Sequence, residues 1–304
     1  MALETLHHDQ LIWTNIVRPT PADIAQLGQQ HPNFHPLELE DCLSRIERPK
    51  IDDHEDYLFL VMHFPVWDPE RRISIPGEVD FFIGPGYLVT VHEGELKPLV
   101  NFFELCKSSE EARAQFFTSP GKLLHTVIDR LVDYVFPILY KVDANIRSIE
   151  ETMFDENMQR TIQDISIVRR DIVALRRIIR PQVPIVFNLE QLKRSFIHDN
   201  LEVYFGDILD HLQKARDIVD DNTEVIANLA DTVDALASHR INEVIRVLTV
   251  ISLVLLPLEV IVGFMGMNVL LPLQDFRYAW LVIIGVMVAL VAMLLGYFKY
   301  KKWL

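Results

Sequence analysis

The fold class is decided by two stretches near the end of the chain: Val247 to Met265, VLTVISLVLLPLEVIVGFM, and Tyr278 to Phe298, YAWLVIIGVMVALVAMLLGYF. The later stretch has 21 residues and no charged side chain. At about 1.5 Å of rise per residue, a helix of that length crosses the roughly 30 Å hydrocarbon core of a bilayer. The earlier stretch is less purely apolar because it contains Thr249, Ser252 and Glu259. Both stretches are predicted to be transmembrane helices.

The positive charges that flank the two stretches predict their orientation. Arg240 and Arg246 precede the first stretch, and three lysines follow the second: Lys299, Lys301 and Lys302. The intervening loop, residues 266–277, holds a single arginine. Because basic residues concentrate on the cytoplasmic side of membrane proteins, we expect both termini in the cytoplasm and the loop outside. The expected location is the cell inner (plasma) membrane.

The rest of the chain is strongly acidic. The 304 residues have a net charge of −14, and the first 245 of them hold 24 basic and 41 acidic residues. A nucleic-acid-binding protein normally carries a basic surface, so nucleic acid is not an expected partner. Half of the residues are apolar and the mean hydropathy is +0.16, which excludes a disordered acidic chain. An acidic body suits the binding of cations, or simply solubility.

The first 120 residues combine strand and helix patterns. Thr20-Pro21-Ala22-Asp23 has the order of an N-cap, a proline at N1 and an acidic N3, which predicts the start of a helix. A second helix is expected to begin at His35-Pro36. The turn sequence Gly84-Pro85-Gly86 predicts a hairpin between two strands. Short apolar or alternating runs predict four strands: LIWTNIV (11–17), YLFLVMHF (57–64), VDFFIG (79–84) and YLVTVHEG (87–94).

From about residue 121 the pattern becomes helical, because apolar residues recur three or four positions apart. One helix is expected over residues 121–154 and a second over 162–179. A third is expected from about residue 201 and, without glycine or proline between Gly206 and Pro257, leads directly into the first transmembrane stretch. Helices this long need partners along their length, so we expect a stalk in a homo-oligomer.

The chain is therefore predicted to be an α+β membrane protein with three parts. These are a cytoplasmic α/β domain (1–120), a stalk or funnel of long helices (121–245) and a transmembrane domain (246–304). The last part is expected to contain a first transmembrane helix at 247–265, an external loop at 266–277, a second transmembrane helix at 278–298 and a basic cytoplasmic tail at 299–304.

One seam of the first transmembrane helix is polar or small. Positions spaced alternately four and three residues apart stay on one side of a helix in a left-handed bundle, and here they are Ser238, Asn242, Ile245, Thr249, Ser252, Leu256, Glu259, Gly263 and Gly266. Two interpretations are open. The seam could serve only for close helix packing, as in a membrane-anchored sensor or scaffold. Alternatively, it lines a water-filled pore shared by identical copies.

Glu259 favours the pore. An ionised carboxylate near the middle of a bilayer costs roughly 3 kcal/mol on the insertion scale, and Arg246 precedes it by 13 residues. The cost recurs in every subunit, and an aqueous axis or a cation on that axis relieves it. The expected depth of Glu259 in the membrane also leads to the hypothesis that its protonation couples transport to protons.

Gly266-Met267-Asn268 stands at the end of the first transmembrane stretch. With the two spans and the tail YFKYKKWL, it resembles the signature of the CorA-type magnesium transporters. HPLELEDCLSRIERPKID (35–52) and LRRIIRP (175–181) are also similar to that family, so the resemblance covers essentially the whole chain. It implies a homopentameric funnel with a ring of Asn268 side chains at the external mouth. The family's pore-lining positions correspond to Asn242, Ile245, Leu248, Ser252, Leu256, Glu259 and Gly263, so Leu248 takes the place of its neighbour Thr249.

The resemblance implies channel-like uptake of divalent cations, with Mg²⁺ as the main cargo and Co²⁺ and Ni²⁺ as further ones. Mg²⁺ dehydrates reluctantly, and a ring of neutral amide carbonyls can hold the hydrated ion through its waters without trapping it. The implied regulatory residues are Asp41 and Asp207, where cytoplasmic Mg²⁺ would bind between subunits and control gating. No organic cofactor is expected.

Two departures from the family pattern bear on the ion. The loop VLLPLQD (269–275) has no glutamate, so either Asp275 supplies the external acid or none is needed, and Glu259 stands at a pore position that is usually uncharged. The ZntB-type zinc transporters share the architecture and lack that loop glutamate, so Zn²⁺ is the alternative cargo. An enzyme is not expected, because the sequence contains no nucleophile elbow, Walker loop or HExxH motif.

Overall fold

The computed structural model describes residues 3–44, 47–154, 158–194, 196–197, 201–267, 278–301 and 303. The chain divides into two compact units, Met1–Ala230 and Asp231–Leu304. Each unit is described by itself below. The predicted boundaries at residues 120 and 245 stay predictions.

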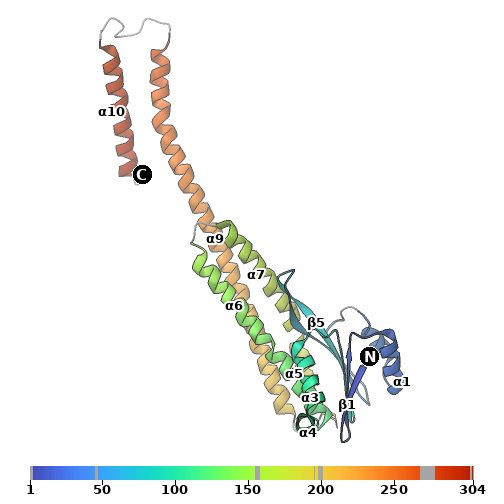
Figure 1. Cartoon of the computed structure of the whole chain (residues 1–304). Coiled ribbons are helices and arrows are strands. Elements are labelled where there is room, and N and C mark those ends of the chain that lie inside the picture. Colours follow the sequence, from blue (N-terminus) through green and yellow to red (C-terminus); the bar gives the residue numbers. More distant parts are fainter. Residues whose placement is uncertain are drawn as a thin grey trace. The chain divides into compact units, whose positions relative to one another are not determined.

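A six-stranded sheet forms the centre of the first unit, in the order β1-β2-β6-β5-β4-β3 (Figure 1). Its strands are β1 (Leu3–His8), β2 (Leu11–Val17), β3 (Lys50–Asp53), β4 (Leu58–Asp68), β5 (Ile73–Gly84) and β6 (Tyr87–His92). Strands β2 and β6 are parallel, and the other neighbouring pairs are antiparallel. The hairpin turn predicted after Gly84 is confirmed, with Gly84 opposite Tyr87 and Gly86 at φ +81°, a conformation that favours glycine.

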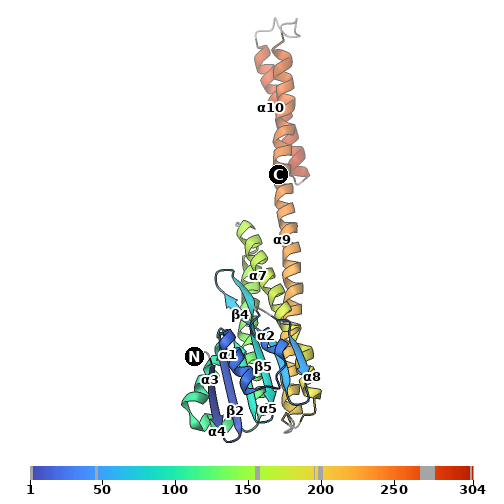
Figure 2. The same ribbon diagram turned by 90° about the vertical axis from the view of Figure 1, so that its right-hand side faces the viewer.

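Two short helices cover one face of the sheet, α1 (Pro21–Gln30) and α2 (Pro36–Asp41) (Figure 2). The predicted start of α1 is confirmed: the Asp23 amide donates to Thr20 Oγ1 at 3.3 Å, and the Thr20 amide donates to Asp23 Oδ2 at 3.0 Å. Between α1 and α2, the Phe34 ring stacks on Phe82 of the sheet with centroids 4.3 Å apart. This apolar face forms one of two core layers.

The opposite face packs against a second set of helices. These are α3 (Lys97–Ser108), α4 (Glu110–Phe116), α5 (Pro120–Asp133), α6 (Val135–Thr152), α7 (Met158–Ile179) and α8 (Gln182–Gln191). Trp13 of β2 is fully buried there against Phe102 and Phe103 of α3, with ring centroids 5.4 and 4.9 Å away. The first unit therefore has three layers, with the sheet between two sets of helices.

A chain of buried hydrogen bonds joins β2 to β6 on this second face. Trp13 Nε1 donates to Thr90 Oγ1 at 3.1 Å, and Thr90 Oγ1 donates to Asn15 Oδ1 at 2.6 Å. Asn15 Oδ1 also lies 3.1 Å from His92 Nε2. Because buried polar groups are costly without partners, these bonds fix the register of the parallel pair.

The helix expected over residues 121–154 is two helices, α5 and α6, with a break at Tyr134. Pro137 explains the break, because a proline has no amide hydrogen for the carbonyl of Asp133 and its ring crowds that carbonyl. The next helix, α7, ends at Ile179 as expected from Pro181 but begins at Met158, earlier than the sequence suggested.

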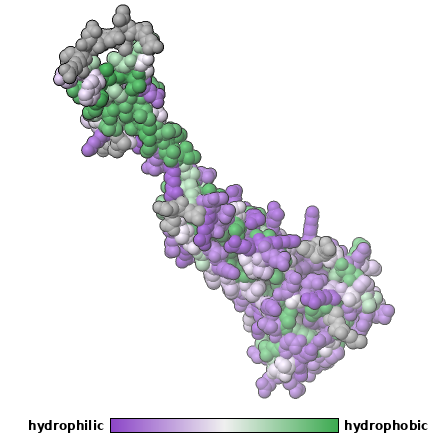
Figure 3. All heavy atoms as spheres, turned by 45° about the horizontal axis from the view of Figure 1, so that its top comes forward, coloured by the Kyte–Doolittle hydropathy of each residue, from purple (hydrophilic) through white to green (hydrophobic). Residues whose placement is uncertain are grey.

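Two further helices account for the apolar end of the chain, α9 (Glu202–Met265) and α10 (Ala279–Tyr300). Helix α9 is continuous for 64 residues, as predicted, and its residues from Asp231 onward belong to the second unit. Both helices contain windows long and apolar enough to cross a membrane, with only 6% of those windows buried inside the protein. Hydrophobic residues dominate the surface of this part of the chain (Figure 3).

Candidate functional site

The polar seam of α9 is open to solvent in the single chain. Its members Asn242, Ser252, Glu259 and Gly263 are all exposed, and so are the apolar members Ile245, Leu248 and Leu256, whose exposed fractions are 54, 62 and 60%. Thr249 is half-buried. A Cβ added at Gly263 would meet no atom within 4 Å. Nothing in the described part of this chain therefore packs on the C-terminal half of the seam, from Ser252 to Gly263.

Helix α10 packs on the other side of α9. An apolar groove lies between them, lined by Leu258 of α9 and by Ile284, Met287, Val288, Val291, Ala292 and Leu295 of α10. The less exposed positions of α9 in this region are Val250, Val254, Pro257, Leu258, Ile261 and Met265. Ser252 follows Val250 by two residues, and Leu256 follows Val254 by two. Since each residue advances a helix by about 100°, the polar seam points roughly opposite to α10.

Two of the seam's hydroxyls, those of Thr249 and Ser252, already donate their hydrogens to the helix. Thr249 Oγ1 donates to the Ile245 carbonyl at 2.7 Å, and Ser252 Oγ donates to the Leu248 carbonyl at 2.9 Å. Back-bonding of this kind satisfies the donor and leaves the oxygen lone pairs free. The seam thus presents acceptor oxygens, which suit a hydrated cation.

Helix α9 ends at Met265, directly before the Gly-Met-Asn tripeptide. The Gly266 amide donates to the Val262 carbonyl at 2.9 Å, and the Met267 amide donates to the Phe264 carbonyl at 3.3 Å. The Met267 side chain is 52% exposed. Asn268 and Asp275, predicted for the external mouth and loop, lie outside the described residues.

Asp41 lies at the end of α2 and already has a cation partner. Lys50 Nζ lies 2.8 Å from Asp41 Oδ2 and 3.1 Å from Asp52 Oδ2. Although partial burial of Lys50 opposes the effect, its hydrogen bonds to Asp41 and Asp52 raise the Lys50 pKa. Asp207 is exposed on α9, and no hydrogen bond or ion pair in the described part of the chain joins it to Asp41.

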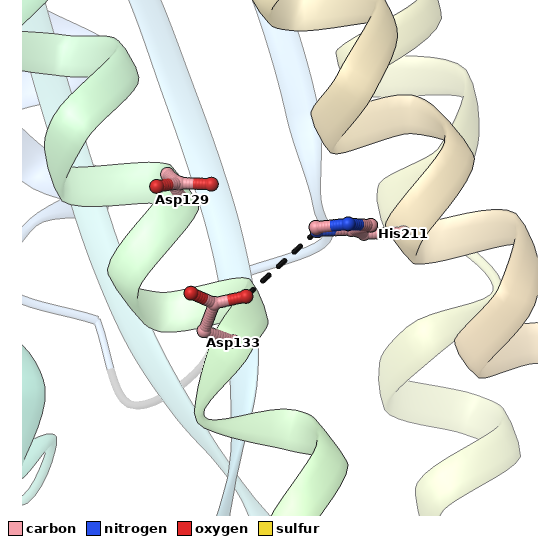
Figure 4. A group of neighbouring side chains, drawn as sticks. All are labelled: Asp129, Asp133 and His211. Atoms are coloured by element: carbon pink, nitrogen blue, oxygen red, sulfur yellow. Dashed lines mark ion pairs between the residues drawn. The ribbon is translucent and has the colours of Figure 1, made fainter.

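A cluster that the sequence reasoning missed lies between α5 and α9. Asp129 and Asp133 of α5 and His211 of α9 turn their side chains toward one another, with one ligand atom from each residue within 4.8 Å of the others (Figure 4). His211 Nδ1 is buried, lies 3.8 Å from Asp133 Oδ1 and has no hydrogen-bond partner among the described residues. We call these three residues the Asp-Asp-His cluster. The sequence shows that Asp129 and Asp133 are four residues apart on one helix, but it does not show that α5 contacts α9.

The electrostatics of the cluster favour a bound cation. Burial raises the pKa of Asp129, and the charge of Asp133 adds to the increase. Asp207 raises it further, whereas His125 and His211 lower it. A positive ion would relieve the repulsion between these carboxylates. The predicted regulatory residue Asp207 thus belongs to the same charged region as the cluster.

Comparison with known proteins identifies the family. The model of the CorA-like Mg²⁺ transporter proteins matches residues 8–301. This chain belongs to that family. The sequence-based identification, drawn from the tripeptide, the spans and the tail, is therefore confirmed at the level of the family.

Two individual relatives match nearly the whole of this chain, and a third matches part of it. YfjQ of Bacillus subtilis is 30% identical over 292 residues, which are 96% of this chain and 89% of that protein. The cobalt/magnesium transport protein CorA of Thermotoga maritima is 29% identical over 297 residues, covering 96 and 83%. The zinc transport protein ZntB of Pectobacterium atrosepticum is 21% identical over 188 residues, covering 62 and 57%.

The fold is also that of a solved CorA. The complete structure of the CorA magnesium transporter from Methanocaldococcus jannaschii superposes with a TM-score of 0.85 at 18% identity, covering 98% of this chain and 93% of that one. The predicted fold class is confirmed: an α/β N-terminal region, a long helix and two apolar C-terminal helices. This chain is therefore a membrane-embedded divalent metal ion transporter of the CorA family, not an enzyme.

Proposed function

We propose that several copies of this chain, five by resemblance to the CorA-type transporters, surround a water-filled axial pore lined by α9 and conduct Mg²⁺ into the cell. The observation that carries the proposal is the exposed seam, which points away from α10. An exposed oxygen-bearing seam inside a membrane needs either water or a partner. Symmetric assembly provides both, because each copy contributes the same seam to one axis.

Glu259 lies on the exposed side of α9, where no basic side chain of the described second unit forms an ion pair with it. Facing lipid, an ionised carboxylate would cost roughly 3 kcal/mol in each copy on the insertion scale. Facing a wet axis, it attracts cations into the pore. The same position makes Glu259 the residue at which a proton could be exchanged with the pore water.

At the outer end, Gly266, Met267 and Asn268 follow the last turn of α9. We place a ring of Asn268 amides at the external mouth, where carbonyl oxygens contact the waters of a hydrated Mg²⁺ ion. Neutral ligands bind such an ion weakly enough for it to leave again. Asp275 would add negative charge near this mouth, and both termini would lie in the cytoplasm of a cell whose inner membrane holds the protein.

At the cytoplasmic end, Asp41 and Asp207 are proposed to bind regulatory Mg²⁺ between neighbouring subunits. The Asp-Asp-His cluster supports this role for the α5–α9 region, since it gathers uncompensated acceptors around Asp207. Bound cations would neutralise repulsion within an acidic body and stabilise the closed arrangement, and their loss would release it.

The pore is tested with a cysteine at the seam. The native Cys42 and Cys106 are buried, so a charged, membrane-impermeant methanethiosulfonate should leave uptake by wild-type proteoliposomes unchanged. It should block uptake by Ser252→Cys and spare Met287→Cys, whose side chain lies in the groove between α9 and α10. Equal sensitivity of the two variants, or insensitivity of Ser252→Cys, would refute the proposed pore wall. Undiminished uptake by Asn268→Ala would refute the external ring.

Zn²⁺ is the second candidate cargo. Similarity to a zinc transport protein, ZntB of Pectobacterium atrosepticum, 21% identical over 188 residues, favours it. In the same proteoliposomes, excess Mg²⁺ should suppress uptake of trace Zn²⁺ if Mg²⁺ is the main cargo. Zn²⁺ uptake that resists Mg²⁺ and follows an imposed pH gradient would instead support the zinc transporter.

A further inference from the structure

A cavity of about 390 Å³ lies between the end of β4, the β4–β5 turn and the helices α6 and α7. Its walls include Trp67, Arg72, Lys141, Asn145 and Arg160, all in the first unit. Sites of roughly 300–1,000 Å³ hold small organic molecules. The cavity is separate from the α9 seam and from the Asp-Asp-His cluster, and neither the transport proposal nor the regulatory proposal uses it.

The cavity gathers positive charge within an acidic body. Three cationic side chains line it: Arg72, Lys141 and Arg160. Arg160 pairs loosely with Asp164, at 3.9 Å. In the described part of the chain, neither Arg72 nor Lys141 has a carboxylate within the 4.0 Å of an ion pair. Cations without an ion-pair partner around a hollow attract anions into it, although the protein as a whole is acidic.

The two acidic wall residues, Asp164 and Asp171, offset only part of the charge of the three cations. Asp171 is 5% exposed, and its Oδ1 accepts the Ser74 amide at 2.6 Å, so it serves the contact between α7 and β5. Asp164 remains half-buried beside Arg160. A carboxylate in such a place is a suitable acceptor for sugar hydroxyls, the role acidic residues take in dinucleotide sites.

The uncharged part of the wall is mostly apolar, with one aromatic ring, Trp67, and two polar residues, Asn145 and Ser148. Lys141 Nζ lies 4.8 Å from the centroid of the Trp67 ring, which fixes the ammonium group at the rim. Ile149 and Val168 are buried in the wall. A flat apolar surface next to a cationic rim matches a ligand with a ring at one end and anionic oxygens at the other.

We propose that this cavity binds a nucleoside phosphate, with the phosphates between Arg72 and Lys141 and the base against the Trp67 side. A free phosphate would leave the apolar part of the cavity empty, and a nucleoside alone would leave the two cations unpaired. The proposal is independent of ion conduction.

The test measures binding of radiolabelled ADP to the purified full chain by equilibrium dialysis in EDTA. Saturable binding with a Kd below about 1 mM is expected. Lys141→Gln and Arg72→Gln should each weaken it about tenfold, as loss of a charge-assisted hydrogen bond predicts. Lys97→Gln and Arg169→Gln, which remove exposed charges outside the cavity, should not change it. Lys141→Arg keeps the charge and should retain most of the affinity, which separates a binding role from misfolding.

Competition with unlabelled adenosine and with inorganic pyrophosphate identifies what is recognised. Each is expected to compete far more weakly than ADP. Pyrophosphate that competes as well as ADP would show a simple anion site, and adenosine that competes as well would show an apolar site. Either result, the absence of saturable ADP binding, or equal affinity in the cavity and control variants would overturn the proposal.

Discussion

The Lys50 side chain places a positive charge beside Asp41, where a regulatory metal ion is proposed to bind. Its ammonium group lies 2.8 Å from Asp41 Oδ2, so a metal ion must compete with it for the carboxylate. We predict that Lys50→Gln lets cytoplasmic Mg²⁺ inhibit uptake at a concentration about three- to fivefold lower, the factor expected from a partly exposed ion pair worth up to about 1 kcal/mol. Uptake into proteoliposomes with a graded lumenal Mg²⁺ concentration measures this.

Lys107→Gln is the matched control for that experiment. Lys107 forms an ion pair with Glu4 of β1, and its loss should leave Mg²⁺ inhibition unchanged. An unaltered or higher inhibitory concentration in Lys50→Gln would contradict the role of Asp41.

His92 should make the fold sensitive to acid. Burial lowers its pKa from 6.5 to about 4. Its hydrogen bonds agree, since Nδ1 accepts the Gly94 amide at 3.0 Å and can do so only when unprotonated. Between pH 6.5 and about 4, His92 is therefore protonated in the unfolded chain but neutral in the folded chain. The contribution of His92 to stability is full above pH 6.5 and is lost as the pH falls to about 4, a change of about 3 kcal/mol.

Thermal unfolding of the full chain and of His92→Gln, followed from pH 7 to pH 4.5, tests this. Asp80, Asp129 and Asp171 have raised pKa values and act in the opposite direction, so the difference between the two proteins isolates His92. The wild-type Tm should fall more steeply with acid than that of the variant. Parallel curves would show that His92 is protonated in both states.

At the scale of the helix, Gly121 lets the first turn of α5 approach the segment that precedes α9. A Cβ at this position would lie 2.9 Å from the Ile197 Cα and 2.6 Å from Leu201 Cδ1, and the Gly121 amide donates to the Phe196 carbonyl at 3.1 Å. Gly121→Ala should therefore lower the free energy of unfolding by about 1–3 kcal/mol through overpacking, measured by denaturant titration.

Gly206→Ala is the control for Gly121→Ala. Gly206 lies inside α9, where an added Cβ would meet only the end of the Glu190 side chain, at 3.3 Å. Alanine is the better helix former by about 1 kcal/mol, so this change should be neutral or stabilising. Equal destabilisation of both variants would indicate that glycine flexibility, not close packing, matters at residue 121.

Local sequence patterns predicted the elements whose structure depends on residues close together in the chain. The capping residues Thr20 and Asp23, the turn at Gly84 to Gly86 and the unbroken α9 all follow from local rules. The split between α5 and α6 also has a local cause, Pro137, whose effect we did not predict. Helices α3, α4 and α8 were not expected, since they are short and their apolar spacing is weak over so few turns.

For the whole molecule, candidate sites formed within one helix could be predicted from the sequence, whereas sites formed by tertiary contacts could not. The seam of α9 could be predicted because one helix carries all of its residues except the last, Gly266. The Asp-Asp-His cluster was not, because His211 meets Asp129 and Asp133 only when α5 packs on α9. The cavity beside Trp67 likewise requires a strand end and two helices to converge. Sites built by tertiary contacts leave no periodic trace in the sequence.

The hydrogen-bonded chain from Trp13 to His92 has a consequence for the order in which the protein assembles during synthesis. Strands β1 and β2 can pair as soon as they leave the ribosome, but β2 meets its other neighbour only after β6, some seventy residues later, has emerged. Until then one edge of the nascent hairpin stays open to wrong pairings. If β2 and β6 paired one residue out of register, Asn15 and Thr90 would be buried without their hydrogen-bond partners. These buried polar side chains therefore disfavour wrong pairings when the sheet closes.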